Sequence, residues 1–196
     1  MNRIQVATTG LFAAWLVHDL EELATMTNNS RVLLARLPGW VPVPASVRAH
    51  GFTNRHVATA IPAVGLVVAA AAVRGYRTQG HSALYQNALL GFGLHGLGHI
   101  GMSAVTGRYV SGAATAPVIV LPFWLWATRA LNQGGVPNRR TVPAAVALAA
   151  GSIAVGHLVA SVLTRNRHRV DPHGRSRVAV ASPVPEGAVS IVDRDL

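Results

Sequence analysis

The sequence has no cysteine and no lysine, and it has few acidic residues. Without cysteine, disulfide bonds and thiolate metal sites are both excluded. The 17 basic residues are therefore all arginine, and they stand against only 7 acidic residues. From Leu23 to Val170 the chain contains no carboxylate side chain at all. Because a soluble protein distributes acids over its whole surface, this pattern indicates that most of the chain is not exposed to water.

The composition favours a lipid bilayer over nucleic acid as the partner. The formal net charge is +10, but the arginines lie between apolar runs and do not form one basic patch. Apolar residues make up 51% of the chain and the mean hydropathy is +0.36. Arginines that border apolar runs are typical of anchoring at lipid headgroups. The alanine-rich, lysine-free composition suggests a GC-rich bacterium, so we expect a multi-pass protein of the bacterial cytoplasmic (inner) membrane.

The predicted fold class is all-α: a polytopic transmembrane helical bundle of about five spans. A span needs roughly 20 mainly apolar residues at about 1.5 Å rise per residue. Five segments meet this need: Gln5–Met26, Val57–Val73, Ser82–Gly107, Tyr109–Thr128 and Thr141–Thr164. The first is the least apolar, because it carries three acids and a histidine.

Two further segments complete the predicted organisation. Residues 31–44 predict a short interfacial helix, stopped by Pro38 and Gly39, with Trp40 at headgroup level. We assign residues 1–164 to the membrane bundle and residues 165–196 to a basic, disordered tail. The positive-inside rule, with the tail's arginines included, places the C-terminal tail in the cytoplasm.

Apart from those in the tail, all the acids lie in the run His18-Asp19-Leu20-Glu21-Glu22. In a helix, His18, Glu21 and Glu22 share one face, with Asp19 at its edge. Each charge buried in a membrane span costs a few kcal/mol, so these acids require compensating partners. His95 and His99 lie four residues apart in another apolar segment and can supply them, because glycines such as Gly91 and Gly98 allow close helix approach.

Three imidazoles and two carboxylates suit a divalent cation such as Zn, Fe or Mn. We therefore predict that His18, Glu21, Glu22, His95 and His99 bind a metal ion. Glu22 or Glu21 is the predicted catalytic base, acting on a metal-bound water. The predicted supporting residues are Asp19, Asn87 and His56, with His157 as a further candidate. The alternative is that these side chains form a structural polar network or ordinary helix packing.

The pattern His18-x-x-Glu21-Glu22 resembles the HXXEE family of bacterial integral membrane proteins. The resemblance extends from about Leu11 to Trp126. It includes Asn87 followed by His95, and a segment that reads Arg108-Tyr109-x-x-Gly112-x-x-Thr115-Ala116 and leads to Leu121-Pro122. The chain departs from the family in having Leu94 where members often carry proline before the middle histidine. The resemblance implies a membrane bundle with a site, but it implies no reaction.

These observations predict a metal-dependent membrane enzyme, a hydrolase or oxidoreductase, that acts on a lipid or another apolar substrate. A proton- or cation-coupled transporter is the first alternative, because intramembrane Glu and His residues also form proton relays. A non-catalytic membrane accessory protein with a structural polar cluster is the second. A bis-imidazole haem protein is a further alternative.

Overall fold

The structure is a computed structural model that describes residues 2–36, 38–41 and 43–169, and over these ranges the chain is helical without a strand. The all-α prediction is therefore confirmed. In chain order the elements are α1 (Arg3–Ala35), α2 (Ala45–His50), α3 (Asn54–Arg77), α4 (Ala83–Thr106), the π-helical turn η1 (Ala116–Val120), α5 (Leu121–Gln133) and α6 (Val142–Arg169).

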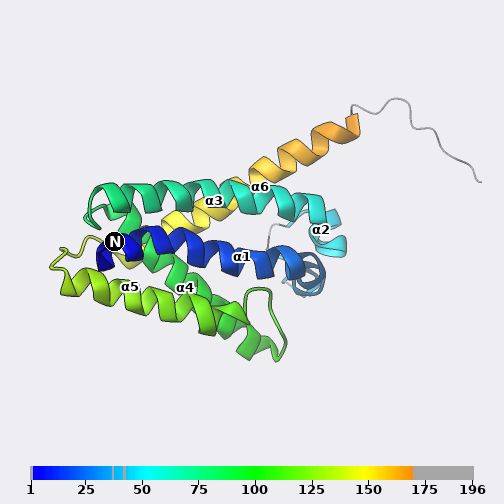
Figure 1. Cartoon of the computed structure of the whole chain (residues 1–196). Helices are drawn as coiled ribbons and strands as arrows, with labels where there is room; N and C mark the ends of the chain where they lie inside the picture. Colours follow the sequence, from blue (N-terminus) through cyan, green and yellow to red (C-terminus); the bar gives the residue numbers. More distant parts are fainter. Residues whose placement is uncertain (1, 37, 42, 170–196) are drawn as a thin grey trace, which may run out of the picture.

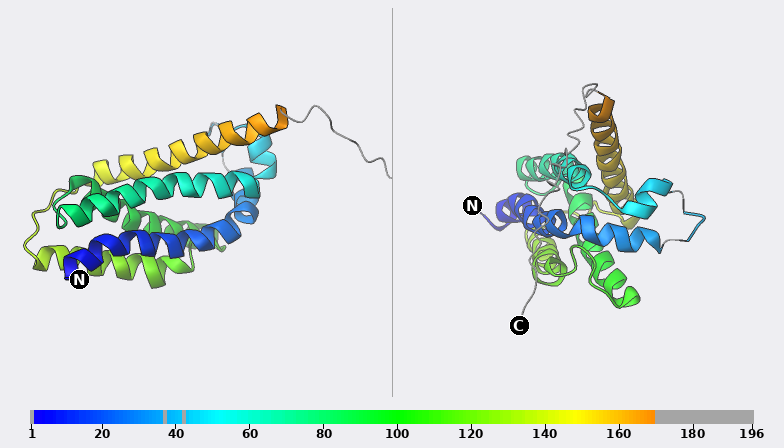
Figure 2. Two further views of the ribbon diagram at one scale, coloured as in Figure 1. Left: turned by 45° about the horizontal axis from the view of Figure 1, so that its top comes forward. Right: turned by 90° about the vertical axis from the view of Figure 1, so that its right-hand side faces the viewer.

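The long helices run up and down a single bundle (Figure 1). α1 lies between α3 and α5, and α6 packs against α3 and α4 (Figure 2). The turns at residues 78–82 and 134–141 lie at the same end as the N-terminus. The short helix α2 and the loop at residues 107–115 lie at the opposite end. Polar groups from the middle of α1 and the second half of α4 are thereby brought toward the α2 end.

Local sequence signals set where these helices begin and end. Asn2 and Gln5 form a reciprocal capping box at the start of α1, and the Thr53 and Ser82 side chains cap α3 and α4. α4 ends at Gly107, which takes the left-handed conformation (φ +61°) that glycine adopts without steric cost. Pro122, which has no N–H to donate, follows the π turn at the start of α5.

Among the described residues, three helices are long and apolar enough to cross a membrane: Asn54–Arg77, Ala83–Thr106 and Val142–Thr164. The prediction of about five spans is thus supported for three of them. α1 is long enough at 33 residues but carries the acidic run. α5 has only 13 residues, because residues 109–114 of the predicted fourth span are not helical and residues 116–120 form the π turn η1.

The prediction of a separate interfacial helix at residues 31–44 is wrong. α1 continues to Ala35, since no proline or glycine interrupts it, and the separate short helix is α2. Trp40 in the intervening loop is 83% exposed, as expected for a headgroup anchor. α6 continues through residues 165–169, which the sequence analysis assigned to the tail. The rest of the predicted tail lies outside the described residues.

Close helix packing depends on glycine at specific contacts. The core centres on aromatic and aliphatic side chains of α1, α4 and α5, including Leu11, Trp15 and Tyr85. A Cβ atom added at Gly93 in α4 would lie 2.2 Å from Cδ2 of Trp124, whereas one added at Gly98 would meet nothing within 4 Å. Gly98 therefore does not serve the close helix approach that the sequence analysis assigned to it.

This difference predicts opposite effects of the same substitution on one helix. Gly93→Ala should lower the melting temperature in nanodiscs, because the indole of Trp124 must move out of the core. Gly98→Ala is the matched control and should leave the melting temperature unchanged or raise it, since alanine favours helix by about 1 kcal/mol over glycine. Equal melting temperatures for the two variants would contradict the packing described here.

Candidate metal centre

α1 turns three of the four polar groups of its acidic run toward the interior. His18 is completely buried, and Asp19 and Glu22 are also buried, at 6% and 5% exposure. Leu20, between them, is exposed. The helical period thus separates one apolar position that faces outward from polar positions that face the bundle.

Four side chains from two helices converge at one point. His18 and Glu22 of α1 and His95 and His99 of α4 each offer one ligand atom, and these atoms all lie within 4.8 Å of one another. In a tetrahedral zinc site with Zn–N bonds of about 2.0–2.1 Å, neighbouring ligand atoms lie about 3.3 Å apart. The observed group is therefore close to the size that a bound cation requires.

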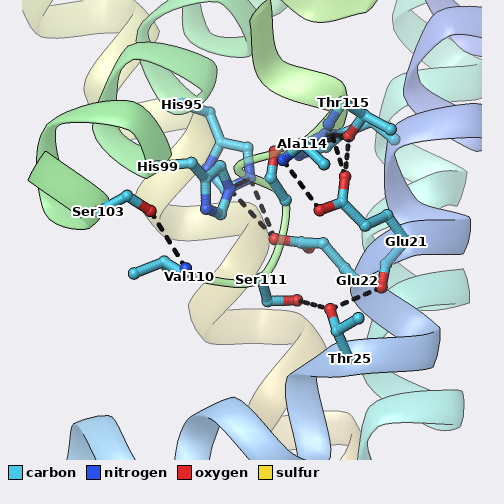
Figure 3. A network of polar contacts seen from close by, with 12 residues as sticks. Glu21, Glu22, Thr25, His95, His99, Ser103, Val110, Ser111, Ala114 and Thr115 are labelled. Carbon is cyan, nitrogen blue, oxygen red and sulfur yellow. Dashed lines mark hydrogen bonds and ion pairs between the residues drawn. The ribbon is translucent and has the colours of Figure 1, made fainter. Parts of the chain in front are cut away.

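The two α4 imidazoles point at the Glu22 carboxylate (Figure 3). Nε2 of His99 lies 3.1 Å from Oε1 of Glu22, and Nε2 of His95 lies 3.7 Å from it. The two Nε2 atoms are 2.8 Å apart, because the one-turn spacing places both rings over the same point. The His95 side chain is 31% exposed, so one side of the group is open to an approaching molecule.

Glu21, predicted as a ligand and as a catalytic base, lies outside this group. Its carboxylate faces the 107–115 loop (Figure 3) and accepts hydrogen bonds from the backbone N–H of Thr115 at 2.7 Å and of Ala114 at 3.0 Å. The hydroxyls of Thr115 and Tyr109 also donate to it. Partial burial, and then the bond to Glu21, raise the pKa of the Tyr109 phenol, which keeps it a neutral donor. Glu21 therefore ties the loop to α1.

Thr115 links the Glu21 carboxylate to the buried imidazole of His18. Its hydroxyl donates to Glu21, and its oxygen lies 2.7 Å from Nδ1 of His18. Because Thr115 donates its hydroxyl hydrogen to Glu21, Nδ1 of His18 must be the donor to the Thr115 oxygen. This assigns the lone pair of the neutral ring to Nε2, the nitrogen that faces the four-residue group.

Gly112 lets the loop backbone approach the imidazoles. It adopts a positive φ of +85°, and an added Cβ would lie 2.8 Å from Cε1 of His18 and 3.0 Å from Cε1 of His99. A side chain at this position would displace both rings. Glycine is thus required here both by backbone conformation and by space.

The donor set fits a divalent cation better than it fits a closed hydrogen-bond network. His18 Nε2 and Glu22 Oε1 are buried and without a well-formed hydrogen bond. Such buried polar atoms are costly unless something satisfies them. A cation bound among three imidazole nitrogens and one carboxylate oxygen would satisfy all four ligand atoms, and this N₃O set suits Zn, Fe or Mn.

The predicted supporting residues are not members of the four-residue group. Asp19 lines the same cavity as Glu22 and His95. Asn87 uses its amide to bind Ala83 O and Thr141 N, which fixes the start of α6. The structure therefore gives Asn87 local structural contacts.

His56 does not join the four-residue group. Its Nε2 lies 2.9 Å from Nδ1 of His157, and Phe52 stacks on both rings. His157 lines the cavity, so this second histidine pair borders the space next to the candidate metal centre.

The sequence analysis missed the part that the 107–115 loop plays in the site. Tyr109, Gly112 and Thr115 contact the site residues directly, and Ser111 bonds Thr25 of α1 at 2.6 Å. The available signal was the Arg108–Ala116 segment, which was noted as part of a resemblance but given no role. A loop that is distant in sequence by about 90 residues cannot be placed against α1 from spacing alone.

Within the described residues, the fold and the site define a helical protein with three membrane-type helices and a His/Glu group close enough to hold a metal ion. The chain belongs to the HXXEE family, described as a protein of unknown function with HXXEE motif, whose model matches residues 9–127. That range includes all four residues of the group and the whole 107–115 loop. No curated protein and no solved structure matches the chain.

The different surroundings of the adjacent glutamates predict different consequences of the same substitution. Glu21→Gln replaces one of the two acceptor oxygens with an NH₂ group, so two of the four loop donors lose their acceptor and the other two lose a charged one. The loop should therefore loosen, and trypsin should cleave more rapidly after Arg108. Glu22→Gln, the matched control, leaves those contacts in place and should cleave at the wild-type rate. The measurement is the rate of limited proteolysis in nanodiscs, and equal acceleration in both variants would disprove the tether.

Proposed function

We propose that this protein is a metal-dependent membrane enzyme, a hydrolase or oxidoreductase, that acts on a lipid or another apolar substrate. The observation that carries the proposal is the meeting of the four-residue group with a largely apolar cavity inside a helical bundle. A polar reaction centre beside an apolar binding space is the usual arrangement of sites for small apolar molecules.

His18, Glu22, His95 and His99 would hold the cation. When bound, a divalent cation supplies Lewis acidity and lowers the pKa of a coordinated water to about 7. His18 is oriented by Thr115, and Glu21 orients Thr115 in turn. Glu21 is thus proposed as a positioning residue. Asp19 and Glu22 are the carboxylates that line the cavity. Glu22 would hold the cation through one oxygen and could accept a proton from a bound water through the other.

The proposed location is the bacterial cytoplasmic membrane, with α1 and the η1–α5 segment crossing alongside the three apolar helices. Support comes from their positions parallel to those helices within the bundle. The arginine bias in the sequence supports a cytoplasmic C-terminal tail, which would place the 107–115 loop near the cytoplasmic side. The candidate metal centre would then lie in the cytoplasmic half of the bundle.

The structural role of Glu21 favours one competing function, that of a non-catalytic membrane accessory protein. Its four donors come from one loop, and this is what a polar cluster that only specifies folding would show. The buried Nε2 of His18 without a partner favours the enzyme, because a purely structural network has no reason to leave a buried nitrogen unpaired. Metal content separates the two functions.

Protein purified in nanodiscs should contain about one divalent metal ion per chain by elemental analysis. His95→Ala and His18→Ala should each lose most of that metal, because each variant removes one of four ligands. His81→Ala is the control, since His81 is an exposed loop residue outside the group, and it should retain wild-type metal. A metal-free wild type, or metal content unaffected by both ligand variants, would contradict the proposal.

Loss of the Thr115 hydroxyl should weaken metal binding without removing a ligand. Thr115→Val keeps the side-chain volume but releases His18 from its orientation, and such outer contacts are typically worth about 10–100-fold in metal affinity. Thr106→Val, which removes an exposed hydroxyl bonded only to its own helix, should bind metal as the wild type does. Competition titration with a chelating dye measures both affinities. An unchanged affinity in Thr115→Val would show that this orientation is irrelevant to metal binding.

A further inference from the structure

A cavity of about 240 Å³ adjoins the candidate metal centre. Its wall is formed by α1, α3, α4 and α6, and it includes ligand residues of both α1 and α4. Pockets that hold drug-sized ligands begin at about 300 Å³. The cavity is therefore large enough for one slender molecule and too small to enclose a lipid with two acyl chains.

The ionisable groups of the cavity gather toward its α2 end, where apolar residues such as Met26 and Ala60 also line it, and the other end is apolar. Its ionisable lining residues are Asp19, Glu22, His95, His99 and His157. On α4 and α6, which run toward the α2 end, these residues follow the apolar lining positions. On α1, Asp19 and Glu22 follow Trp15 and precede Met26. The apolar positions nearer the N-terminal end include Trp15, Ala88, Phe92, Leu148 and Ala149.

Asn87 does not disturb this division, although it lines the apolar end. Both groups of its amide are occupied, one by Ala83 O and the other by Thr141 N. Along α4, the distance from Ala88 to His99 is about 16 Å at 1.5 Å per residue. The cavity is thus long relative to its volume, and it has one apolar end and one polar end.

We propose that this cavity binds a single-chain amphiphile, with its acyl chain toward Trp15 and Ala88 and its oxygen-bearing head at the His/Glu group. An amphiphile of this kind fits the volume, the length and the division of polarity of the cavity together. The proposal rests on the proposed function only for the direction of the head. Binding of the acyl chain itself requires no metal.

The test is native mass spectrometry of the full-length protein released from phosphatidylcholine nanodiscs incubated with dodecanoic acid. The mass of the adduct distinguishes a single-chain fatty acid from a two-chain phospholipid. The wild type should retain one dodecanoic acid per chain, at saturable occupancy. Chelator-treated protein should retain it as well, so failure of metal binding and failure of fatty acid binding are separate results.

Filling the apolar end should weaken this binding. Ala149→Phe and Ala88→Phe place a ring in the cavity from two different helices, and each should weaken dodecanoic acid binding roughly tenfold or more. Two variants are used because Ala149 packs near Gly91 and its replacement also strains the α4–α6 contact. Ala150→Phe is the matched control, since Ala150 is exposed and does not line the cavity, and it should bind as the wild type does.

Three outcomes would overturn the proposal. They are no retained fatty acid in the wild type, equal retention in Ala88→Phe and Ala150→Phe, and retention of a two-chain phospholipid in place of the fatty acid. Equal retention in these two variants would show that the fatty acid binds only on the outer, lipid-facing surface of the protein. Thermal unfolding of each variant in the same nanodiscs identifies any loss of binding that is caused by misfolding.

Discussion

The structure depends on compensation for negative charge inside an apolar helix bundle. A carboxylate in a membrane-type helix is costly unless donors or cations surround it. The adjacent residues Glu21 and Glu22 meet this requirement in two different ways. Glu21 receives four donors from the 107–115 loop, and Glu22 meets His95 and His99 of α4. The two carboxylates are adjacent in sequence, but Glu21 has a structural role and Glu22 is available for chemistry.

Thr115 joins the two halves of this arrangement, because its hydroxyl bonds Glu21 while its oxygen meets the imidazole of His18. Gly112 completes the contact by allowing the loop backbone to touch the rings of His18 and His99. The loop, α1 and α4 thus hold the site together. The HXXEE motif and the segment around Tyr109 both lie within the residues that match the family model.

The sequence alone predicted the helical class and the meeting of His95 and His99 with the acidic run, since charge burial required a partner and few candidates existed. It did not separate Glu21 from Glu22, because residues three and four positions from His18 share a helix face equally well. The loop that makes the distinction lies far away in sequence. The π turn that shortens α5 was equally hidden, since Tyr109–Thr128 is apolar enough to suggest continuous helix.

We propose that three imidazoles and the Glu22 carboxylate surround one cation. X-ray absorption at the metal edge of the loaded protein tests it most directly. We expect a shell of nitrogen and oxygen atoms at about 2.0–2.2 Å, with outer-shell scattering from three imidazoles that falls to two in His18→Ala. A shell of oxygen atoms alone, or imidazole scattering that does not change in that variant, would contradict it.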